Sequence, residues 1–392
     1  MKKLRERQVS LRMALTMCAA AGAITAVICL ISTGWNTNEV GKKLREIDRL
    51  VSDKYVGELD ADNVADYAAA GYITGLGDKW SSYIPAENYE AYRMSGEGKG
   101  CGIGVSVTST ETSIRVTLVY DDSPAAKAGI EKGDYILGTG DLTTEKDGSS
   151  AVISAISGKE GTDVTVTVKK ADGSAKELTM QRAVVTQKMA WGKMLNDKIG
   201  YIRITQFTGV TGEQYQEAFD DLQKQGMEKV IVDLRDNPGG LLDSVCDVLR
   251  KILPEGLIVY TEDKDGNREE EKCDGKNELR IPLAVLVNES SASASEIFAG
   301  AVQDYGIGTI VGTTTYGKGV VQSIRQLSDG SAIKLTVANY YTPKGNNINK
   351  TGIKPDIEVS LDTSLLNKNK DEITHDEDNQ LQEAIKAVEK EK

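Results

Sequence analysis

The sequence contains one histidine in 392 residues, and this scarcity excludes several kinds of chemistry. His375 lies in a polar, acidic stretch at residues 371–378. A Ser-His-Asp triad needs an imidazole base, and most zinc sites use several histidines or cysteines. A histidine triad and a multi-histidine zinc site are therefore nearly excluded. A hydrolase built from this chain needs another base.

Cysteine and the large aromatic residues are also scarce. The five cysteines are scattered, with neither the arrangement of a disulfide framework nor the spacing of a metal site. The chain has three Phe and three Trp but 39 Gly, which is typical of turn-rich β structure. Its net charge of −12 argues against a nucleic-acid partner. We expect no metal and no other cofactor.

A long uncharged segment, residues 13–35, begins at Met13 and ends at Trp35. A run of this length can cross a bilayer, and the basic residues before it predict that the N-terminus stays in the cytoplasm. A cleaved signal peptide is the alternative, but its alanines should end the apolar run, whereas here they lie inside it. Residues 1–36 therefore predict a single-pass anchor in the cell membrane, with the rest of the chain outside the cytoplasm.

Residues 37–95 indicate helices. Val40, Leu44 and Ile47 repeat at helical spacing, and GDKWSSYIP at residues 77–85 breaks the pattern. We expect a packing or dimerisation module here and no chemistry from it. A dimerisation module would form a homodimer, and the sequence leaves the oligomeric state open.

Residues 96–183 change to glycine-rich sequence with strands of alternating polarity. KGCGIGV at residues 99–105 places three glycines before a strand. SPAAKAGIEKGDYIL at residues 123–137 predicts a short helix, a turn and a strand. Together these stretches resemble a PDZ domain that covers the whole segment.

The PDZ resemblance implies a peptide-binding groove. Backbone amides at Gly102, Ile103 and Gly104 would receive the C-terminal carboxylate of a peptide, and the strand at residues 103–108 would pair with that peptide. Residues 150–156 would form the opposite wall. Such a domain can also act as a gate, and whether it inhibits or activates is left open by the sequence.

Residues 184–360 alternate strands and helices, as α/β domains do. A strand at residues 229–235 ends in DNPGG at residues 236–240. The paired glycines, Gly239 and Gly240, let backbone amides approach a ligand closely where a helix begins, and such amides stabilise developing negative charge.

A serine-rich turn follows the next buried strand. NESSASASEI at residues 288–297 lies between that strand and an apolar helix. Ser293 and Glu296 have the spacing of a capping box, in which serine and glutamate satisfy each other's free amides. A plain helix start explains this pattern, and only the rest of the chain indicates more.

Lys318 is the base that remains available to activate a serine. A serine hydroxyl needs a base to become a nucleophile, and lysine serves this role in Ser-Lys hydrolases. The pKa of a free lysine is about 10.4, so Lys318 must be buried to be neutral near pH 7. Lys318, Val320 and Gln322 occupy every second position of a predicted strand and would point to the same face. Gln322 would then hydrogen-bond the Lys318 amine.

The order of DLRDNPGG, SASASEIFAG and TYGKGVVQ resembles the C-terminal processing peptidases, or tail-specific proteases, over about residues 40–360. The resemblance implies an α/β protease core, a ClpP/crotonase-like spiral of strands and helices. It also implies an inserted PDZ β-domain and an N-terminal helical region. Residues 361–392 lie outside the match. The pattern at residues 380–388 indicates a helix, and we expect the segment to form a mobile tail or a dimer arm.

The same resemblance implies a role for each site residue. Ser293 would be the nucleophile, Lys318 the general base and Gln322 the residue that orients it. The amides of Gly239 and Ala294 would form the oxyanion hole.

The function implied is a membrane-anchored, extracytoplasmic serine endopeptidase that cleaves proteins recognised by their C-terminal tails. A catalytically silent PDZ scaffold and acyl transfer to a group other than a peptide are the alternatives.

Overall fold

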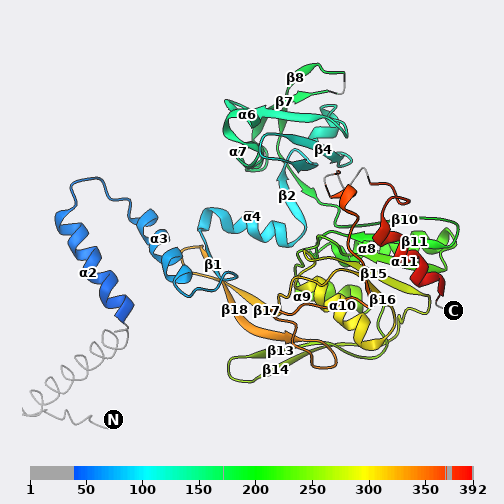
Figure 1. Ribbon diagram of the computed structural model, residues 1–392. Helices are drawn as coiled ribbons and strands as arrows, with labels where there is room; N and C mark the ends of the chain where they lie inside the picture. The colour runs from blue at the N-terminus through cyan, green and yellow to red at the C-terminus, as the bar shows by residue number, and fades with distance from the viewer. Residues whose placement is uncertain (1–38, 171, 367, 369–372, 391–392) are drawn as a thin grey trace, which may run out of the picture. The chain divides into compact units, whose positions relative to one another are not determined.

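The computed structural model describes residues 39–170, 172–366, 368 and 373–390 (Figure 1). The chain divides into two compact units, Met1–Ala65 and Asp66–Lys392, which are considered separately. The predicted membrane anchor at residues 13–35 lies outside the described residues. Within the described ranges, no helix combines the length and the apolar composition that a membrane crossing requires.

The N-terminal region is helical, as predicted. Helix α2 (Glu39–Lys54) has no buried residue, and its apolar side chains Val40, Leu44 and Ile47 are 40–49% exposed. The boundary between the two units falls inside α3 (Ala61–Thr74), and α4 (Ala86–Gly96) follows in the second unit.

The predicted PDZ domain is a sheet with three short helices. Its strands are β3 (Val105–Ser109), β4 (Ile114–Val119), β5 (Tyr135–Thr139), β6 (Leu142–Thr143), β7 (Asp163–Lys169) and β8 (Ala175–Gln181). The order is β3-β4-β5-β7-β8, with β6 paired to β5. Its helices are α5 (Pro124–Lys127), α6 (Thr144–Asp147) and α7 (Ser149–Ile156).

Alternation along β7 explains the core of this domain. Val164, Val166 and Val168 are buried while the threonines between them are more exposed, so one face of the strand packs inward. At the two ends of the domain, β2 (Lys99–Gly102) pairs antiparallel with β9 (Ala183–Thr186). The chain therefore enters and leaves the PDZ domain through a two-stranded ribbon.

A six-stranded sheet forms the centre of the α/β domain. Its order is β10 (Ala190–Met194), β11 (Ile199–Ile204), β12 (Lys229–Asp233), β15 (Leu283–Val287), β16 (Thr309–Gly312) and β19 (Ile357–Glu358). The β10–β11 pair is antiparallel and the other pairs are parallel. All five residues of β15 are buried, as expected for a parallel strand covered on both faces.

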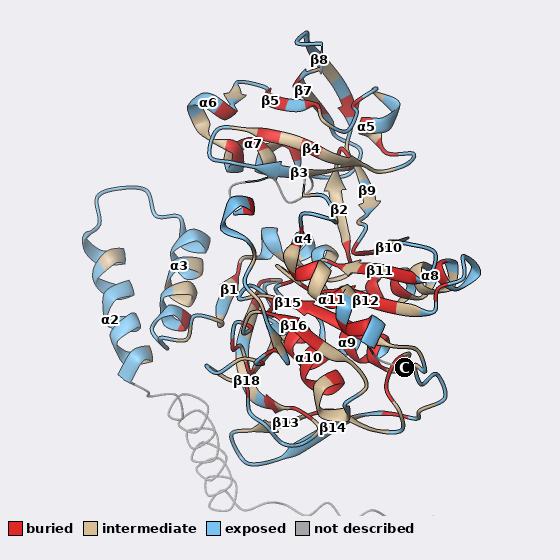
Figure 2. Ribbon diagram, turned by 45° about the vertical axis from the view of Figure 1, so that its right-hand side comes forward, coloured by how far each residue is buried: buried red, intermediate tan, exposed pale blue. Residues whose placement is uncertain are grey.

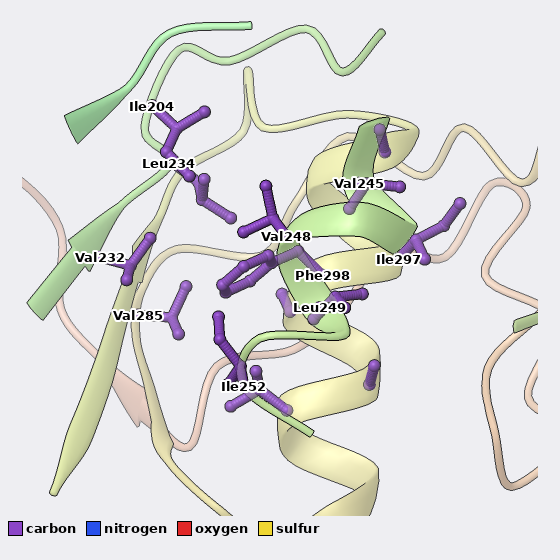
Figure 3. Packing of buried hydrophobic residues seen from close by; sticks show 14 of the residues in the cluster. Ile204, Val232, Leu234, Val245, Val248, Leu249, Ile252, Val285, Ile297 and Phe298 are labelled. Carbon is purple, nitrogen blue, oxygen red and sulfur yellow. The ribbon is translucent and has the colours of Figure 1, made fainter. Parts of the chain in front are cut away.

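Three helices pack in the main core with this sheet: α8 (Thr211–Lys224), α9 (Leu242–Leu249) and α10 (Ala294–Tyr305). Figure 2 shows buried residues concentrated along β12, β15 and α10. In Figure 3, Phe298 of α10 points toward Val285 of the sheet and lies beside Val248 of α9. This packing fixes the beginning of α10, where Ser293 lies.

A second sheet contains the strand after Lys318. Its order is β1 (Ser82–Ile84), β18 (Ala332–Tyr341), β13 (Gly256–Asp263) and β14 (Arg268–Cys273), and β17 (Val320–Gln326) also pairs with β18. The break at residues 77–85 thus includes a strand of this second sheet. The region at residues 37–95 therefore contains one strand besides its helices, and β1 pairs with β18 far along the chain.

The last described helix of the chain packs on the central sheet. After a 3-10 turn (Thr363–Leu365), α11 (Asn379–Lys390) packs on the central sheet. Leu381, Ala384 and Val388 are buried there in a core that includes Ile231 and Leu286. The prediction of a mobile tail or dimer arm is therefore wrong for α11, which covers a face of the central sheet.

Candidate active site

Ser293 lies at the N-terminus of α10 in an unusual backbone conformation. Its φ is 56° and its ψ is −114°, a region that residues other than glycine rarely adopt. Such strain persists only where surrounding contacts hold it, and it is common at active sites. Residues on both sides of Ser293 provide these contacts.

The neighbouring serines attach the turn to the DNPGG loop. Ser291 Oγ donates to Leu234 O at 2.8 Å, and Ser295 Oγ donates to Asn237 O at 3.0 Å. Both serines are fully buried. Their hydroxyls are engaged with backbone carbonyls, which leaves Ser293 as the half-buried serine of the turn.

Glu296 connects this turn to the loop that carries Lys318. Its carboxylate accepts the Ser293 N–H at 2.8 Å, the predicted capping-box contact, and the Lys318 N–H at 2.9 Å. It also accepts the Gly317 N–H at 2.7 Å and the Thr315 hydroxyl at 2.6 Å. Glu296 is fully buried, so these four donors replace the water it would otherwise bind. Structural support, the role predicted for Glu296, agrees with this geometry.

Tyr340 of β18 joins the same two segments from the other side. Its hydroxyl lies 3.0 Å from the carbonyl oxygen of Ser293 and also contacts the carbonyl oxygen of Lys318. Tyr340 is 1% exposed, and burial raises the pKa of its hydroxyl. Sequence reasoning missed this residue, because nothing in the stretch around it indicates contact with a loop 22 residues earlier.

The two glycines beside Lys318 allow close packing of backbone. A Cβ at Gly319 would lie 2.5 Å from Asn349 N, and one at Gly317 would lie 3.0 Å from Lys350 C. Gly317 also has a φ of 84°, which favours glycine. The glycines therefore fix the Lys318 loop against residues 349–352.

Lys318 is half-buried with a lowered pKa. Burial is the largest cause and the nearby Lys334 charge adds to it, while Glu296 acts in the opposite direction, and the pKa of Lys318 falls to about 8. The prediction that this lysine is desolvated agrees with the structure. Its Nζ lies 4.3 Å from the centroid of the Trp80 ring.

Gln322 does not have the predicted contact. Its Nε2 donates to Val320 O at 3.4 Å and to Thr336 Oγ1 at 3.3 Å. The prediction assumed that Lys318 lies on the same strand as Gln322, but β17 begins only at Val320, so the alternation along the strand does not extend to Lys318. In the described part of the chain, no side chain hydrogen-bonds the Lys318 amine.

One of the two amides predicted to form the oxyanion hole, that of Gly239, already donates a hydrogen bond within the protein. A Cβ on Gly239 would lie 2.8 Å from Ser293 Cβ and 2.8 Å from Ala294 N, so the glycine loop lies directly against the serine turn. However, the Gly239 N–H donates to Asn237 Oδ1 at 2.8 Å. An oxyanion could use this amide only after Asn237 releases it. The role of Gly239 and Ala294 therefore stays a prediction.

The PDZ domain contains a groove of about 140 Å³. Gly102, Ile103 and Gly104 line it, and Ile153 and Ile156 of α7 form the opposite wall, as predicted. The strand begins at Val105 rather than at residue 103, because Ile103 O and Gly104 O accept from Ala125 N and Tyr120 N.

Two family models match the chain. Peptidase family S41 matches residues 198–359, and the PDZ domain matches residues 101–181. The structure is also similar to one from Bacteroides fragilis NCTC 9343 assigned to the S41 proteases. The TM-score is 0.54 with 18% identity, covering 86% of this chain and 98% of the other. That likeness concerns the fold.

Two curated relatives are similar over most of their length. The carboxy-terminal processing protease CtpA of Bacillus subtilis is 32% identical over 81% of this chain and 69% of its own. The carboxyl-terminal-processing protease of Picosynechococcus is 37% identical over 74% and 72%. The chain therefore belongs to peptidase family S41, as a serine-type carboxy-terminal processing protease with a PDZ domain.

Proposed function

We propose that this protease uses Ser293 as nucleophile and Lys318 as general base in an endopeptidase reaction. The observation that carries the proposal is the pair of connections between the two residues. Glu296 accepts both of their backbone N–H groups, and Tyr340 contacts both of their carbonyl oxygens. The lowered pKa of Lys318 supports the role, because a base must be neutral to accept a proton.

The proton path follows from these roles. As Ser293 Oγ bonds to the scissile carbonyl carbon, its proton passes to Lys318 Nζ. The ammonium then protonates the leaving amine, and an acyl-enzyme remains. In the second step the neutral lysine takes a proton from water as the water oxygen bonds to the ester carbon. The ammonium then protonates Ser293 Oγ as the C–O bond breaks, which releases the acid product and restores the serine hydroxyl. Ala294 N–H, at the first position of α10, would stabilise the oxyanion together with Gly239 N–H.

We further propose that substrates are captured by their C-terminal tails. The groove at Gly102, Ile103 and Gly104 is lined with apolar side chains and lies beside the edge of β3. A peptide added as a strand to β3 would direct its carboxylate toward this loop.

We also propose that the protein is anchored in the membrane and assembles as a homodimer. The uncharged run from Met13 to Trp35 would anchor the protein in the cell membrane, with the protease outside the cytoplasm. The exposed apolar side chains Val40, Leu44 and Ile47 of α2 would pack against a second copy to form a homodimer.

Casein cleavage by the 392-residue chain in detergent tests the reaction. We expect Ser293→Ala and Lys318→Ala each to lower kcat at least about a thousandfold. Ser290→Ala is the matched control, because Ser290 is exposed in the same turn and should keep full activity. Full activity of Ser293→Ala would refute the assignment.

The alternative is a scaffold that binds peptides without cleaving them. A serine-directed acylating inhibitor distinguishes the two functions. An enzyme should be labelled at Ser293, and Lys318→Ala should abolish labelling. A scaffold should remain unlabelled while still binding peptides with a free carboxylate.

A further inference from the structure

The segment before the PDZ domain contributes to the surroundings of Lys318. Ser82 and Lys334 are partners in the β1–β18 ladder. One residue earlier, Ser81 Oγ accepts the Thr336 N–H at 3.0 Å and donates to Asp78 at 2.6 Å. These contacts fix the short loop at residues 78–81 on the sheet that contains β18.

Trp80 extends from this loop to the candidate base. The Lys318 Nζ lies 4.3 Å from the centroid of its ring. The ring meets Tyr316 edge-on, with centroids 5.8 Å apart. Lys79 donates to the Tyr316 hydroxyl at 2.8 Å and places its own amine 4.6 Å from the Trp80 centroid. Two lysines and two aromatic rings thus form one cluster.

We propose that Trp80 is a positioning residue for Lys318, whose ring face covers the neutral amine and stabilises the ammonium that forms when Ser293 gives up its proton. This inference rests on the proposed function, in which Lys318 is the base. It assigns a role in the reaction to the N-terminal region, for which the sequence predicted no chemistry.

Charged side chains around the Lys318 amine also affect its pKa, in addition to any effect of Trp80. Lys334 of β18 and Lys79 disfavour the ammonium, while Glu296 of α10 and Asp78 favour it. Burial of the amine has the largest effect and favours the neutral form. The Trp80 ring removes water from the amine, and its electron-rich face attracts a cation at this distance.

These two effects of the ring have opposite signs, so two substitutions separate them. Trp80→Leu keeps apolar cover but removes the aromatic face. The ammonium is then less stable, so the midpoint of the pH–rate profile should move to lower pH, and kcat on the alkaline plateau should fall about two- to thirtyfold. Trp80→Ala admits water, so the midpoint should move up toward 10.5, and part of the loss at pH 7 should return at pH 9.5.

Lys79→Met, in the same loop, should move the midpoint of the pH–rate profile in the direction opposite to that of Trp80→Leu. Removing its positive charge should raise the midpoint of the profile, whereas Trp80→Leu lowers it. The Lys79 side chain is exposed, so the effect should be small and should shrink further in high salt.

The experiment measures kcat and KM on a fluorogenic peptide from pH 6 to 10 with the 392-residue chain. Trp191→Leu in β10 is the control and should leave the profile unchanged. Trp80→Phe, which keeps an aromatic face, should recover most of the plateau rate, so misfolding of the smaller variants cannot produce the same pattern.

Two outcomes would overturn the inference. One is a fall in kcat with an unchanged midpoint in every Trp80 variant, which indicates a purely structural role. The other is no change in any of them. If instead Lys318→Ala keeps full activity, the proposed base itself is wrong and the role of Trp80 falls with it.

Discussion

The pKa of Lys318 sets the pH dependence that we expect of the enzyme. Burial lowers it to about 8, from an ordinary value of 10.5. A lysine base acts only in its neutral form, so kcat/KM should rise with pH and level off above about pH 8. Roughly a tenth of the molecules carry neutral Lys318 at pH 7. Initial rates between pH 6 and 10 measure this, and a flat or falling profile would contradict it.

Glu296 offers a second prediction for a single residue. Glu296→Gln keeps the shape of the side chain but places an NH₂ group where two N–H or O–H donors point. We expect a loss of about 2–3 kcal/mol in the free energy of unfolding and a large fall in kcat. Chemical denaturation and casein cleavage measure the two effects.

Glu289→Gln is the control for that substitution. Glu289 is an exposed carboxylate that accepts one hydroxyl, from Thr313. The Glu289→Gln variant should have a free energy of unfolding and an activity close to those of the wild type. If Glu296→Gln behaves in the same way, Glu296 does not support the site.

Local sequence predicted some site residues and could not predict others. Ser293, Glu296 and the glycines around Lys318 belong to short motifs, so their geometry depends on neighbouring residues. The side chain of Gln322 contacts Thr336 of the paired strand β18, and the position of Trp80 depends on pairing between β1 and β18. Such long-range pairing leaves no mark in the local pattern of a three-residue strand.

Helix α11 provides a prediction at the level of a whole element. Arg235, two residues after the end of β12, donates to both carboxylate oxygens of Asp378 and to Gln380. The start of α11 is therefore attached to the segment that leads into the DNPGG loop. Leu381→Ala should lower the free energy of unfolding by about 2–4 kcal/mol, because Leu381 is 2% exposed in the core.

Thermal or chemical unfolding measures that change, with Lys386→Ala as control. Lys386 lies on the exposed side of the same helix and should have little effect. Equal stability of both variants would restore the original expectation of a mobile tail. The signal for the helix was present, since Leu381, Ala384 and Val388 have helical spacing. The sequence did not indicate that this helix packs on the central sheet, because the helix is short and lies in a polar segment.

For the whole molecule, the PDZ groove should determine which substrates are captured. A Cβ on Gly104 would lie 2.3 Å from Ser123 Cβ, so Gly104→Ala must displace the loop that faces the carboxylate. We expect a loss of about tenfold in affinity for a peptide with a free C-terminus, measured by fluorescence anisotropy.

Gly173→Ala controls for backbone strain. Gly173 has a φ of 84°, close to the 82° of Gly104, but a Cβ there meets open space. It should keep the wild-type affinity. If Gly104→Ala also keeps it, or if amidated peptides bind equally well, the loop does not recognise carboxylates.

The pairing of β1 with β18 has a consequence for the timing of biosynthesis. The contact between Lys79 and Tyr316 joins residues 237 positions apart, and β18 follows later still. At about 5–20 residues per second, a ribosome needs roughly 10–50 seconds to make the intervening chain. During that interval Lys79 and Trp80 lack Tyr316 and Lys318, the residues with which they cluster. If Trp80 positions Lys318 as proposed, we expect a newly made chain to gain full activity only after residue 341, the last residue of β18, has been made.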